Sequence, residues 1–222
     1  MKIGIIGAGH IGGNCARRFV KSGKHSVRLS FSRDAATLEM LARDLGPNAS
    51  VGTPSDAARY GDIVLVSVPW DAIPEALKQA ESLAGKIVID TTNQFGSTLP
   101  PKGQTAAEFN AARMAGARYT KSFNTLTAGF QASAAERPKN EKVVQWICGD
   151  DAEAKRIVAG LIEDAGYLPV DLGGMRSCQM MEAPRRKGAV YGEEYRSADA
   201  QAVVAAVREG RPIPPTPHYT AG

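Results

Sequence analysis

Short aliphatic runs and amphipathic segments follow one another along most of the chain. The aliphatic runs predict strands at residues 2–6, 26–31, 62–68, 86–90, 118–123, 143–148 and 167–171, with a short extended piece at 50–51. The segments between them have apolar residues at helical spacing and predict helices at 11–21, 35–45, 53–58, 74–84, 106–115 and 151–164. Because strands and helices alternate, we expect an α/β fold with a doubly wound, mainly parallel sheet.

The pattern changes after Gly173 and Gly174. Residues 175–195 are rich in Met, Arg and Lys and have no clean period, whereas residues 197–208 read as a helix. Residues 212–217 contain four prolines and predict an extended tail. We therefore divide the chain into a sheet domain of residues 1–174 and a C-terminal extension of residues 175–222. The extension is expected to pack on the sheet or on a second subunit.

Composition limits the classes of function. The chain has 222 residues, 43% hydrophobic and 23% charged, with a net charge of +4, which is ordinary for a globular protein. The densest basic run, residues 185–187, is short and has no interleaved aromatics, so nucleic acid is not an expected partner. No apolar run approaches the roughly 20 residues that span a bilayer, so no membrane association is expected.

Three cysteines stand far apart in the sequence and form no CxxC pair. They are Cys15, Cys148 and Cys178. An odd number at this spacing argues against a disulfide framework and against a zinc site, and no other metal-ligand cluster is visible. Cys15 and Cys148 lie in apolar stretches and are expected in the core. We infer a reducing, cytoplasmic location.

A glycine-rich turn follows the first predicted strand. Gly7, Gly9 and Gly12 form a G-x-G-x-x-G motif, with His10 and Ile11 inside it, and the motif opens a predicted helix. Gly7 permits the tight turn, Gly9 lets a pyrophosphate approach the backbone, and Gly12 lets helix and strand pack closely. The amides at the start of the helix suit the phosphates. This context predicts a dinucleotide-binding Rossmann unit.

The end of the second strand bears on which dinucleotide binds. NAD-binding forms usually carry an acidic residue about 20 residues beyond the motif, to hold the ribose 2′-hydroxyl. Ser32 and Arg33 stand there instead. A hydroxyl and a guanidinium would hold a 2′-phosphate through charge-assisted hydrogen bonds. Asp34 comes one step later and is expected to cap the helix that begins at Ala35. NADP is therefore favoured over NAD.

Small polar residues stand beside apolar ones where three further strands end. In this fold the ligand lies along the carboxyl ends of the strands. We expect Pro69, Trp70 and Ile73 to wall the nicotinamide, and Asn93 and Asn124 to hydrogen-bond its carboxamide or the acceptor. The residues at these strand ends are Ser67, Val68, Pro69 and Trp70, then Asn93, then Asn124.

Acid–base candidates are few. His10 is expected to face the dinucleotide, His25 lies before the second strand, and His218 lies in the tail. Lys121, within the strand at residues 118–123, is a candidate to point into the cleft. Hydride transfer between two redox cofactors needs no protein acid or base, whereas an alcohol dehydrogenase needs a proton donor. The catalytic residues stay unassigned.

Taken together, these motifs resemble the NADP-dependent coenzyme F420 reductase family over roughly residues 2–174. The motifs are Gly7-x-Gly9-x-x-Gly12, Ser32-Arg33, residues 64–70, Asp90-x-Thr92-Asn93, residues 121–125 and residues 148–151. The cytoplasmic domain of membrane metalloreductases is similar in the same places. The resemblance implies a Rossmann domain with a small C-terminal part, commonly a homodimer. It places the adenine half of NADP at Gly9, His10, Ile11, Ser32 and Arg33, and the nicotinamide half at Ser67, Val68, Pro69, Trp70 and Asn93.

The sequence departs from this family in two places. F420-reducing members carry a histidine–threonine pair where this chain has Asn124 and Thr125, and an apolar C-terminal helix where this chain has the polar residues 175–196. The acceptor therefore stays open between F420, a flavin and a small carbonyl or imine compound. The alternative is a non-catalytic NADP-binding redox sensor or regulatory module. No large helical substrate domain is visible, so dimerisation through residues 175–195 is a hypothesis for the missing wall.

Overall fold

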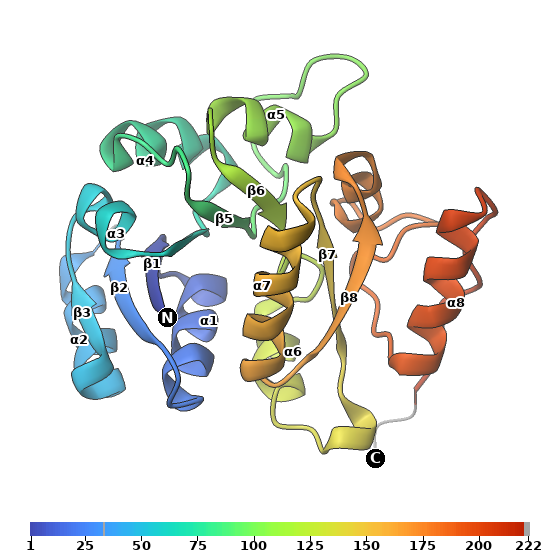
Figure 1. Ribbon diagram of the computed structural model, residues 1–222, viewed down its shortest axis with the longest axis horizontal. Coiled ribbons are helices and arrows are strands. Elements are labelled where there is room, and N and C mark those ends of the chain that lie inside the picture. Colours follow the sequence, from blue (N-terminus) through green and yellow to red (C-terminus); the bar gives the residue numbers. More distant parts are fainter. Residues whose placement is uncertain (33, 220–222) are drawn as a thin grey trace.

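A computed structural model describes residues 1–32 and 34–219, and in it one eight-stranded sheet runs through the protein (Figure 1). The strand order is β3-β2-β1-β4-β5-β6-β7-β8. The strands are β1 (Lys2–Ile6), β2 (Ser26–Ser30), β3 (Ala49–Val51), β4 (Ile63–Val66), β5 (Ile87–Asp90), β6 (Arg118–Lys121), β7 (Val144–Cys148) and β8 (Leu168–Gly173). The order in which successive strands are added to the sheet reverses between β1 and β4, and dinucleotides bind at this point in folds of this order.

The pairing of the strands is mainly parallel, as the sequence predicts. Strands β1 to β6 pair in parallel throughout, and so do β7 and β8. The exception is the antiparallel contact of β6 with β7, whose register is the single pair Lys121 and Cys148. The carboxyl ends of β1, β4, β5 and β6 therefore lie along one edge of the sheet and can share one ligand.

Helices cover both faces of the sheet (Figure 1). They are α1 (His10–Lys21), α2 (Ala35–Leu45), α3 (Pro54–Tyr60), α4 (Ile73–Ala80), α5 (Ala106–Arg113), α6 (Ala128–Ala134), α7 (Ala152–Asp164) and α8 (Ser197–Arg208). One apolar core lies between the sheet and α1, α2, α6 and α7, and the other lies under α3, α4, α5 and α8. An apolar core on each face of the sheet confirms the prediction of a doubly wound α/β fold.

Side-chain caps fix where most of these helices begin. Asp34 accepts a hydrogen bond from the amide of Ala36 and caps α2, as predicted. Thr53 and Thr105 each form a reciprocal capping box at α3 and α5. Asp151 caps α7. Such caps contribute about 1 kcal/mol each, and they explain why the predicted helix starts are close to the observed ones.

Two helices differ from the sequence-based expectation. Helix α4 ends at Ala80 rather than at residue 84, because Glu81 takes a left-handed backbone conformation with φ of 66°. Helix α6 was not expected, since its seven residues include Gly129 and Ser133, which are weak helix formers. The cap of α6, Thr127, is the local signal that could have revealed it.

The C-terminal residues pack on the sheet of their own chain. A 3₁₀ segment, η4 (Met175–Met181), is followed by an irregular stretch and by α8. Tyr195 is buried and meets Trp146 of β7 edge to face, with ring centres 5.3 Å apart. The boundary between two domains stays a prediction, as does the homodimer. Within residues 1–32 and 34–219, the helices are too short or too polar to cross a bilayer.

Candidate dinucleotide and hydride-transfer site

At two positions of the turn, neighbouring backbone comes so close that only glycine fits. Gly7 has φ of 100°, and a Cβ built on it would lie 2.3 Å from the carbonyl oxygen of Ser67. A Cβ on Gly12 would lie 2.0 Å from the carbonyl oxygen of Gly7. The amide of Gly7 also donates to the carbonyl of Ser30 at 2.9 Å. Glycine at both positions therefore lets α1 start directly over the ends of β1 and β4.

Gly9 differs from the other two glycines. A Cβ on Gly9 would meet no atom within 4 Å, and the residue is exposed. As the N-cap of α1 it supplies no side-chain hydrogen bond, and the first turn of α1 contains no acidic residue. The amides at this helix start are thus open to an anion. The space over Gly9 fits a pyrophosphate lying against bare backbone.

The residues that follow β2 lie where the adenosine half of the dinucleotide is predicted to bind. Ser32 is exposed, and its hydroxyl accepts a hydrogen bond from the amide of Asp34 at 3.2 Å. The Asp34 carboxylate is held by the amide of Ala36 and the hydroxyl of Thr37. That carboxylate is therefore committed to capping α2. Arg33, the predicted phosphate ligand, lies outside the described residues.

The end of β4 reaches the same crevice. Val68 is buried against the glycine turn, since its Cγ1 would lie 2.7 Å from a Cβ on Gly7. Pro69 is exposed. The indole of Trp70 is buried and donates from Nε1 to the carbonyl of Thr98 at 2.7 Å. Trp70 therefore fixes the loop after β5 and does not simply line a wall.

Asn93 and Asn124 meet where β5 and β6 end. Asn93 Nδ2 donates to the carbonyl oxygen of Asn124 at 2.9 Å, and Asn124 Nδ2 donates to Asn93 Oδ1 at 3.1 Å. The structure thus brings the two predicted amides together. Among the described residues, Oδ1 of Asn124 and Oγ1 of Thr125 are buried and have no hydrogen-bond partner. Buried polar atoms of this kind are suited to a ligand or water.

The C-terminal segment of the same chain covers this pair. Asn124 Nδ2 donates to the carbonyl of Met181 at 2.6 Å, and the amide of Ala183 donates to Asn93 Oδ1 at 3.3 Å. Further along, the amide of Gly192 donates to the carbonyl of Thr125 at 2.8 Å. Residues 181–192 therefore form a wall beside the strand ends. Part of the wall is therefore supplied within the chain, and dimerisation through residues 175–195 stays a prediction.

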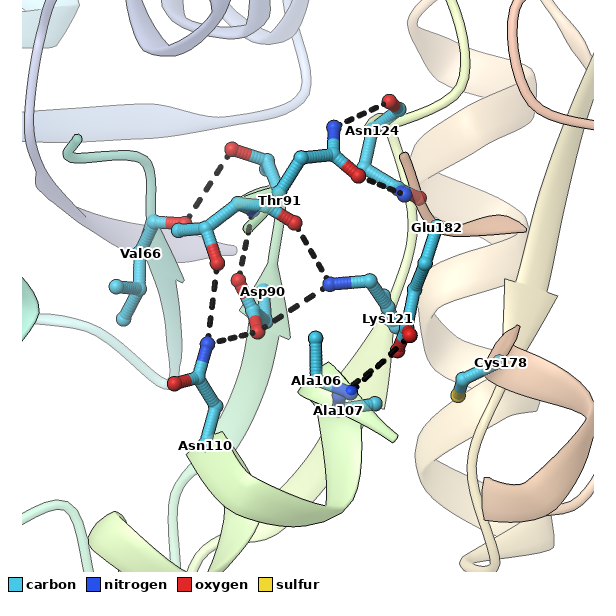
Figure 2. A network of polar contacts seen from close by, with 12 residues as sticks. Val66, Asp90, Thr91, Ala106, Ala107, Asn110, Lys121, Asn124, Cys178 and Glu182 are labelled. Atoms are coloured by element: carbon cyan, nitrogen blue, oxygen red, sulfur yellow. Dashed lines mark hydrogen bonds and ion pairs between the residues drawn. The ribbon is translucent and has the colours of Figure 1, made fainter. Parts of the chain in front are cut away.

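Glu182 anchors that wall on α5. Its two carboxylate oxygens accept hydrogen bonds from the amides of Ala106 and Ala107, at 3.1 Å and 2.8 Å (Figure 2). These amides are free donors in the first turn of α5, where the helix dipole also favours a carboxylate. Sequence reasoning missed Glu182, because its partners are 75 residues or more away along the chain.

A buried polar network lies under the loop that carries Asn93 (Figure 2). The Asp90 carboxylate accepts from the amide of Thr92 at 2.7 Å, from Asn110 Nδ2 at 3.0 Å and from the hydroxyl of Tyr119 at 2.5 Å. The Lys121 ammonium lies 3.5 Å from Asp90 and donates to the carbonyl of Thr92 at 2.7 Å. Both sides of this network converge on Thr92, one residue before Asn93.

Charge and hydrogen bonding keep Asp90 ionised. Burial acts to raise the pKa of Asp90, but the Lys121 ammonium and three hydrogen bonds outweigh it, so that the pKa is lowered. Burial and the negative Asp90 together raise the pKa of Tyr119 well above its usual value. The phenol therefore stays protonated and donates to the carboxylate. The network is a fixed support for the site rather than a source of protons.

The acid–base candidates are dispersed. Lys121 is buried in the Asp90 network and does not point into the cleft as considered above. His10 is exposed at the start of α1. His25 is buried near the opposite edge of the sheet, with Nε2 2.9 Å from Asp164. His218 is exposed in the tail. Within the described part of the chain, no group of three or more His, Cys, Asp or Glu could hold a metal ion.

Comparison with known proteins gives consistent results. Residues 2–94 match the family described as NADP oxidoreductase, coenzyme F420-dependent. The chain is 30% identical over 184 residues to Metalloreductase STEAP3 of Rattus norvegicus, covering 82% of this chain but 36% of that protein. It is 24% identical over 201 residues to the F420-dependent NADP reductase of Methanocaldococcus jannaschii, covering 82% of this chain and 88% of that one.

A solved structure extends the likeness over most of the fold. A hypothetical protein from Sinorhizobium meliloti superposes with a TM-score of 0.75 at 28% identity, covering 89% of this chain and 95% of that chain. By contrast, the chain spans only about a third of the length of the curated metalloreductases it matches (36% and 35%). The sequence similarity to those metalloreductases is therefore limited to about a third of their length.

The sheet order and the glycine turn define a protein of the Rossmann class. Residues 2–94 are similar to the family of coenzyme F420-dependent NADP oxidoreductases, and the likeness to the F420-dependent NADP reductase covers 82% of the chain.

Proposed function

We propose that the protein is an NADPH-dependent oxidoreductase that transfers a hydride between NADP and a flavin-like acceptor, F420 or a flavin, or another small acceptor. The observation that carries the proposal is the open space over Gly9, beside an uncapped helix start. This space lies on the same sheet edge as the Asn93–Asn124 pair. The match of residues 2–94 to a family of NADP oxidoreductases supports it.

The predicted ligands divide into three groups along that edge. In this proposal Gly7 and Gly12 shape the turn, while the backbone at Gly9, His10 and Ile11 takes the pyrophosphate. Ser32 and Arg33 take the 2′-phosphate. The nicotinamide half lies near Ser67, Val68, Pro69, Trp70, Asn93 and Asn124. The bound NADPH supplies the hydride, and no protein group has to supply electrons.

The work left to the chain is binding, orientation and exclusion of water. Asn93 and Asn124 present amide groups that suit a carboxamide, and Asn124 Oδ1 has a free acceptor position in the described structure. Residues 181–192 shield the strand ends from solvent. Asp90 and Lys121 hold the loop at Thr92 but are fully buried. A reaction in which the acceptor takes the hydride and solvent supplies any proton is compatible with this arrangement.

A non-catalytic sensor of the NADP redox state is the second candidate. The observation that favours it is the full burial of two charged groups below the site, Asp90 and Lys121. Mixing the protein with NADPH and, separately, with F420, FMN and ferric citrate decides between the two. We expect loss of the nicotinamide absorbance band with at least one acceptor. Tight NADPH binding without oxidation by any acceptor contradicts the oxidoreductase and supports the sensor.

Arg33 provides the test of NADP preference. We expect Arg33→Ala to weaken NADPH binding by about 1–3 kcal/mol, the scale of a charged hydrogen bond, and to leave NADH nearly unchanged. Titrations of both nucleotides, followed by nicotinamide fluorescence, measure the difference. Equal weakening of the two nucleotides contradicts the assignment of Arg33 to the 2′-phosphate. Arg43→Ala, in the last turn of α2, is the control.

We further propose that the protein is a cytoplasmic homodimer. Its proposed binding partner, besides NADP, is a small-molecule or flavin-like acceptor. The family resemblance supports the dimer, and the three free cysteines support the location. Sedimentation velocity at several protein concentrations tests the dimer. A monomer at all concentrations contradicts it, and leaves the proposed chemistry untouched because residues 181–192 of the same chain already cover the site.

A further inference from the structure

The first residue after β2 has an unusual backbone conformation. Phe31 has φ of 55°, in the left-handed region where glycine is the usual residue. For a bulky side chain this conformation is an outlier, and it persists only where the surroundings fix it. Within residues 1–32 and 34–219, Glu81 and Phe123 are the other non-glycine residues with positive φ. Phe31 directly precedes Ser32, a predicted ligand of the adenosine phosphate.

The strand before Phe31 is fixed against the glycine turn. The carbonyl of Ser30 accepts a hydrogen bond from the amide of Gly7 at 2.9 Å. The buried hydroxyl of Ser30 donates to the carbonyl of Ile5, also at 2.9 Å. Because both groups of Ser30 are bonded to β1 and its turn, the end of β2 cannot shift. The chain therefore has to change direction after Ser30.

The chain after Phe31 is anchored as well. The Ser32 hydroxyl accepts a hydrogen bond from the amide of Asp34 at 3.2 Å, and the Asp34 carboxylate accepts from the amide of Ala36 at 2.9 Å. As an acceptor here, the Ser32 hydroxyl keeps its own proton to donate to a phosphate oxygen. The φ of Phe31 sets the direction in which Ser32 leaves the sheet. A change of this angle would rotate Ser32 away from its place.

The phenyl ring holds the strained backbone in its conformation. Phe31 is partly buried and packs against the apolar core under α3, α4, α5 and α8, which also contains Val68. Burial of apolar surface is favourable and offsets the cost of the left-handed backbone. The ring therefore acts on the site through the backbone that it holds, and not through a contact of its own with a ligand.

We propose that Phe31 is a positioning residue, whose left-handed backbone places the Ser32 hydroxyl to hold the 2′-phosphate of the adenosine half. This inference rests on the proposed function and adds a residue to its NADP preference. It implies that the backbone conformation, rather than the ring, determines phosphate binding. Glycine at residue 31 can adopt the same φ without cost, whereas alanine keeps the cost and lacks the ring that offsets it.

The test compares Phe31→Gly with Phe31→Ala by isothermal titration calorimetry. The probes are adenosine 2′,5′-bisphosphate, which carries the 2′-phosphate, and adenosine 5′-monophosphate, which lacks it. We expect Phe31→Ala to weaken the bisphosphate about tenfold, the scale of one hydrogen bond to a charged group. Phe31→Gly should weaken it less than about threefold. Phe31→Asn should follow Phe31→Gly, because asparagine also tolerates the left-handed region. The monophosphate should bind nearly equally to all these proteins.

Glu81 provides the matched control for the backbone effect. It follows α4 directly, has φ of 66°, and pairs with Arg59 on the surface. Glu81→Gly should melt at a higher temperature than Glu81→Ala, because glycine is free of the left-handed cost. Phe31→Gly should exceed Phe31→Ala in the same direction. Neither Glu81 variant should change the binding of either nucleotide.

The outcomes that overturn the proposal are distinct. Equal weakening of the bisphosphate in Phe31→Gly and Phe31→Ala overturns it, because the ring would then matter rather than the backbone. Unchanged binding in Phe31→Ala, or an equal loss of both nucleotides, overturns it as well. Where Phe31→Ala does not fold, loss of the bisphosphate in Phe31→Gly and Phe31→Asn overturns the proposal, and retention supports it.

The same experiment is independent of the proposed reaction, because the two probes carry no nicotinamide. If glycine at residue 31 restores bisphosphate binding but NADPH is never oxidised by an acceptor, the positioning role of Phe31 stands and the oxidoreductase fails. If NADPH is oxidised and Phe31→Gly binds the bisphosphate as weakly as Phe31→Ala, the oxidoreductase stands and the positioning role fails.

Discussion

The ammonium group of Lys121 lies 3.5 Å from the Asp90 carboxylate, and neither side chain has any exposed surface. Breaking a buried pair by removing one partner leaves a charge without compensation. We expect Lys121→Met to lower the free energy of unfolding by about 3–5 kcal/mol. Urea denaturation measures the change. The double variant Asp90→Asn, Lys121→Met should recover part of the loss.

Lys21→Met is the control for that prediction. Lys21 also pairs with a carboxylate, that of Glu136, but both side chains are mostly exposed. An exposed pair contributes about 0–1 kcal/mol. A loss in Lys121→Met no larger than in Lys21→Met contradicts a structural role for the buried pair.

Gly9 and Gly12 should respond in opposite ways to the same added methyl group. A Cβ on Gly12 would lie 2.0 Å from backbone, whereas one on Gly9 would enter open space. Gly12→Ala should therefore lose about 1–3 kcal/mol of stability through overpacking. Gly9→Ala should keep its melting temperature within a few degrees and bind NADPH at least about tenfold more weakly, which is 1.4 kcal/mol.

Thermal melts and NADPH titrations measure both halves of the glycine prediction. Gly129→Ala on α6, where a Cβ also meets no atom within 4 Å, controls for the methyl group itself. Unchanged NADPH affinity in Gly9→Ala would place the dinucleotide elsewhere.

Glu182 should hold the wall of residues 181–192 on α5. Glu182→Ala removes both acceptors for the amides of Ala106 and Ala107, and we expect a loss of about 1–2 kcal/mol, the scale of a helix cap. Limited proteolysis should then cut the C-terminal segment faster. Glu209→Ala, an exposed control, should melt and digest as the unchanged protein does. Equal digestion of the two variants contradicts the anchoring role.

His25 should make the protein less stable in mild acid. Burial lowers the pKa of His25 from 6.5, and the contact with Asp164 offsets only part of this. The unfolded chain therefore binds a proton at a pH where the folded protein does not. Stability is full above pH 6.5 and falls as the pH drops through the window below it. Melting temperatures at several pH values between about 7.5 and about 5 measure the slope, because this range brackets the ordinary pKa of histidine.

His25→Gln should flatten this slope, since the side chain no longer titrates. His218→Gln, at an exposed position in the tail, should leave it unchanged. The same slope in all three proteins contradicts the assignment to His25.

The sequence predicted what depends on local signals. Gly7 and Gly12 could be assigned because a strand and a helix flank them, and Asp34 because a cap lies just before its helix. Asn93 and Asn124 could be singled out because ligands gather at strand ends, and the structure brings them together. The roles of all the predicted ligands stay predictions, including that of Arg33.

The remainder of the site depends on contacts between distant parts of the chain. Glu182 and α5 are separated by 75 residues, and no local pattern signals their contact. Lys121 was a cleft candidate because its strand gave no sign of the buried partner Asp90, 31 residues earlier by number. Trp70 was expected as a wall residue, and no local pattern signals that its indole also donates to the carbonyl of Thr98. Periodicity reveals burial along one element and says nothing of such pairings.

The wall formed by residues 181–192 and the glycine turn are encoded by different parts of the gene. The glycine turn that begins at Gly7 lies near the N-terminus, whereas the wall comes from a separate stretch much later in the sequence. Under the proposed function, substitutions in the wall change the surface that meets the acceptor and leave the glycine turn unchanged. Descendants of one ancestral reductant-binding unit could therefore diversify in acceptor by changing a dozen codons near its end.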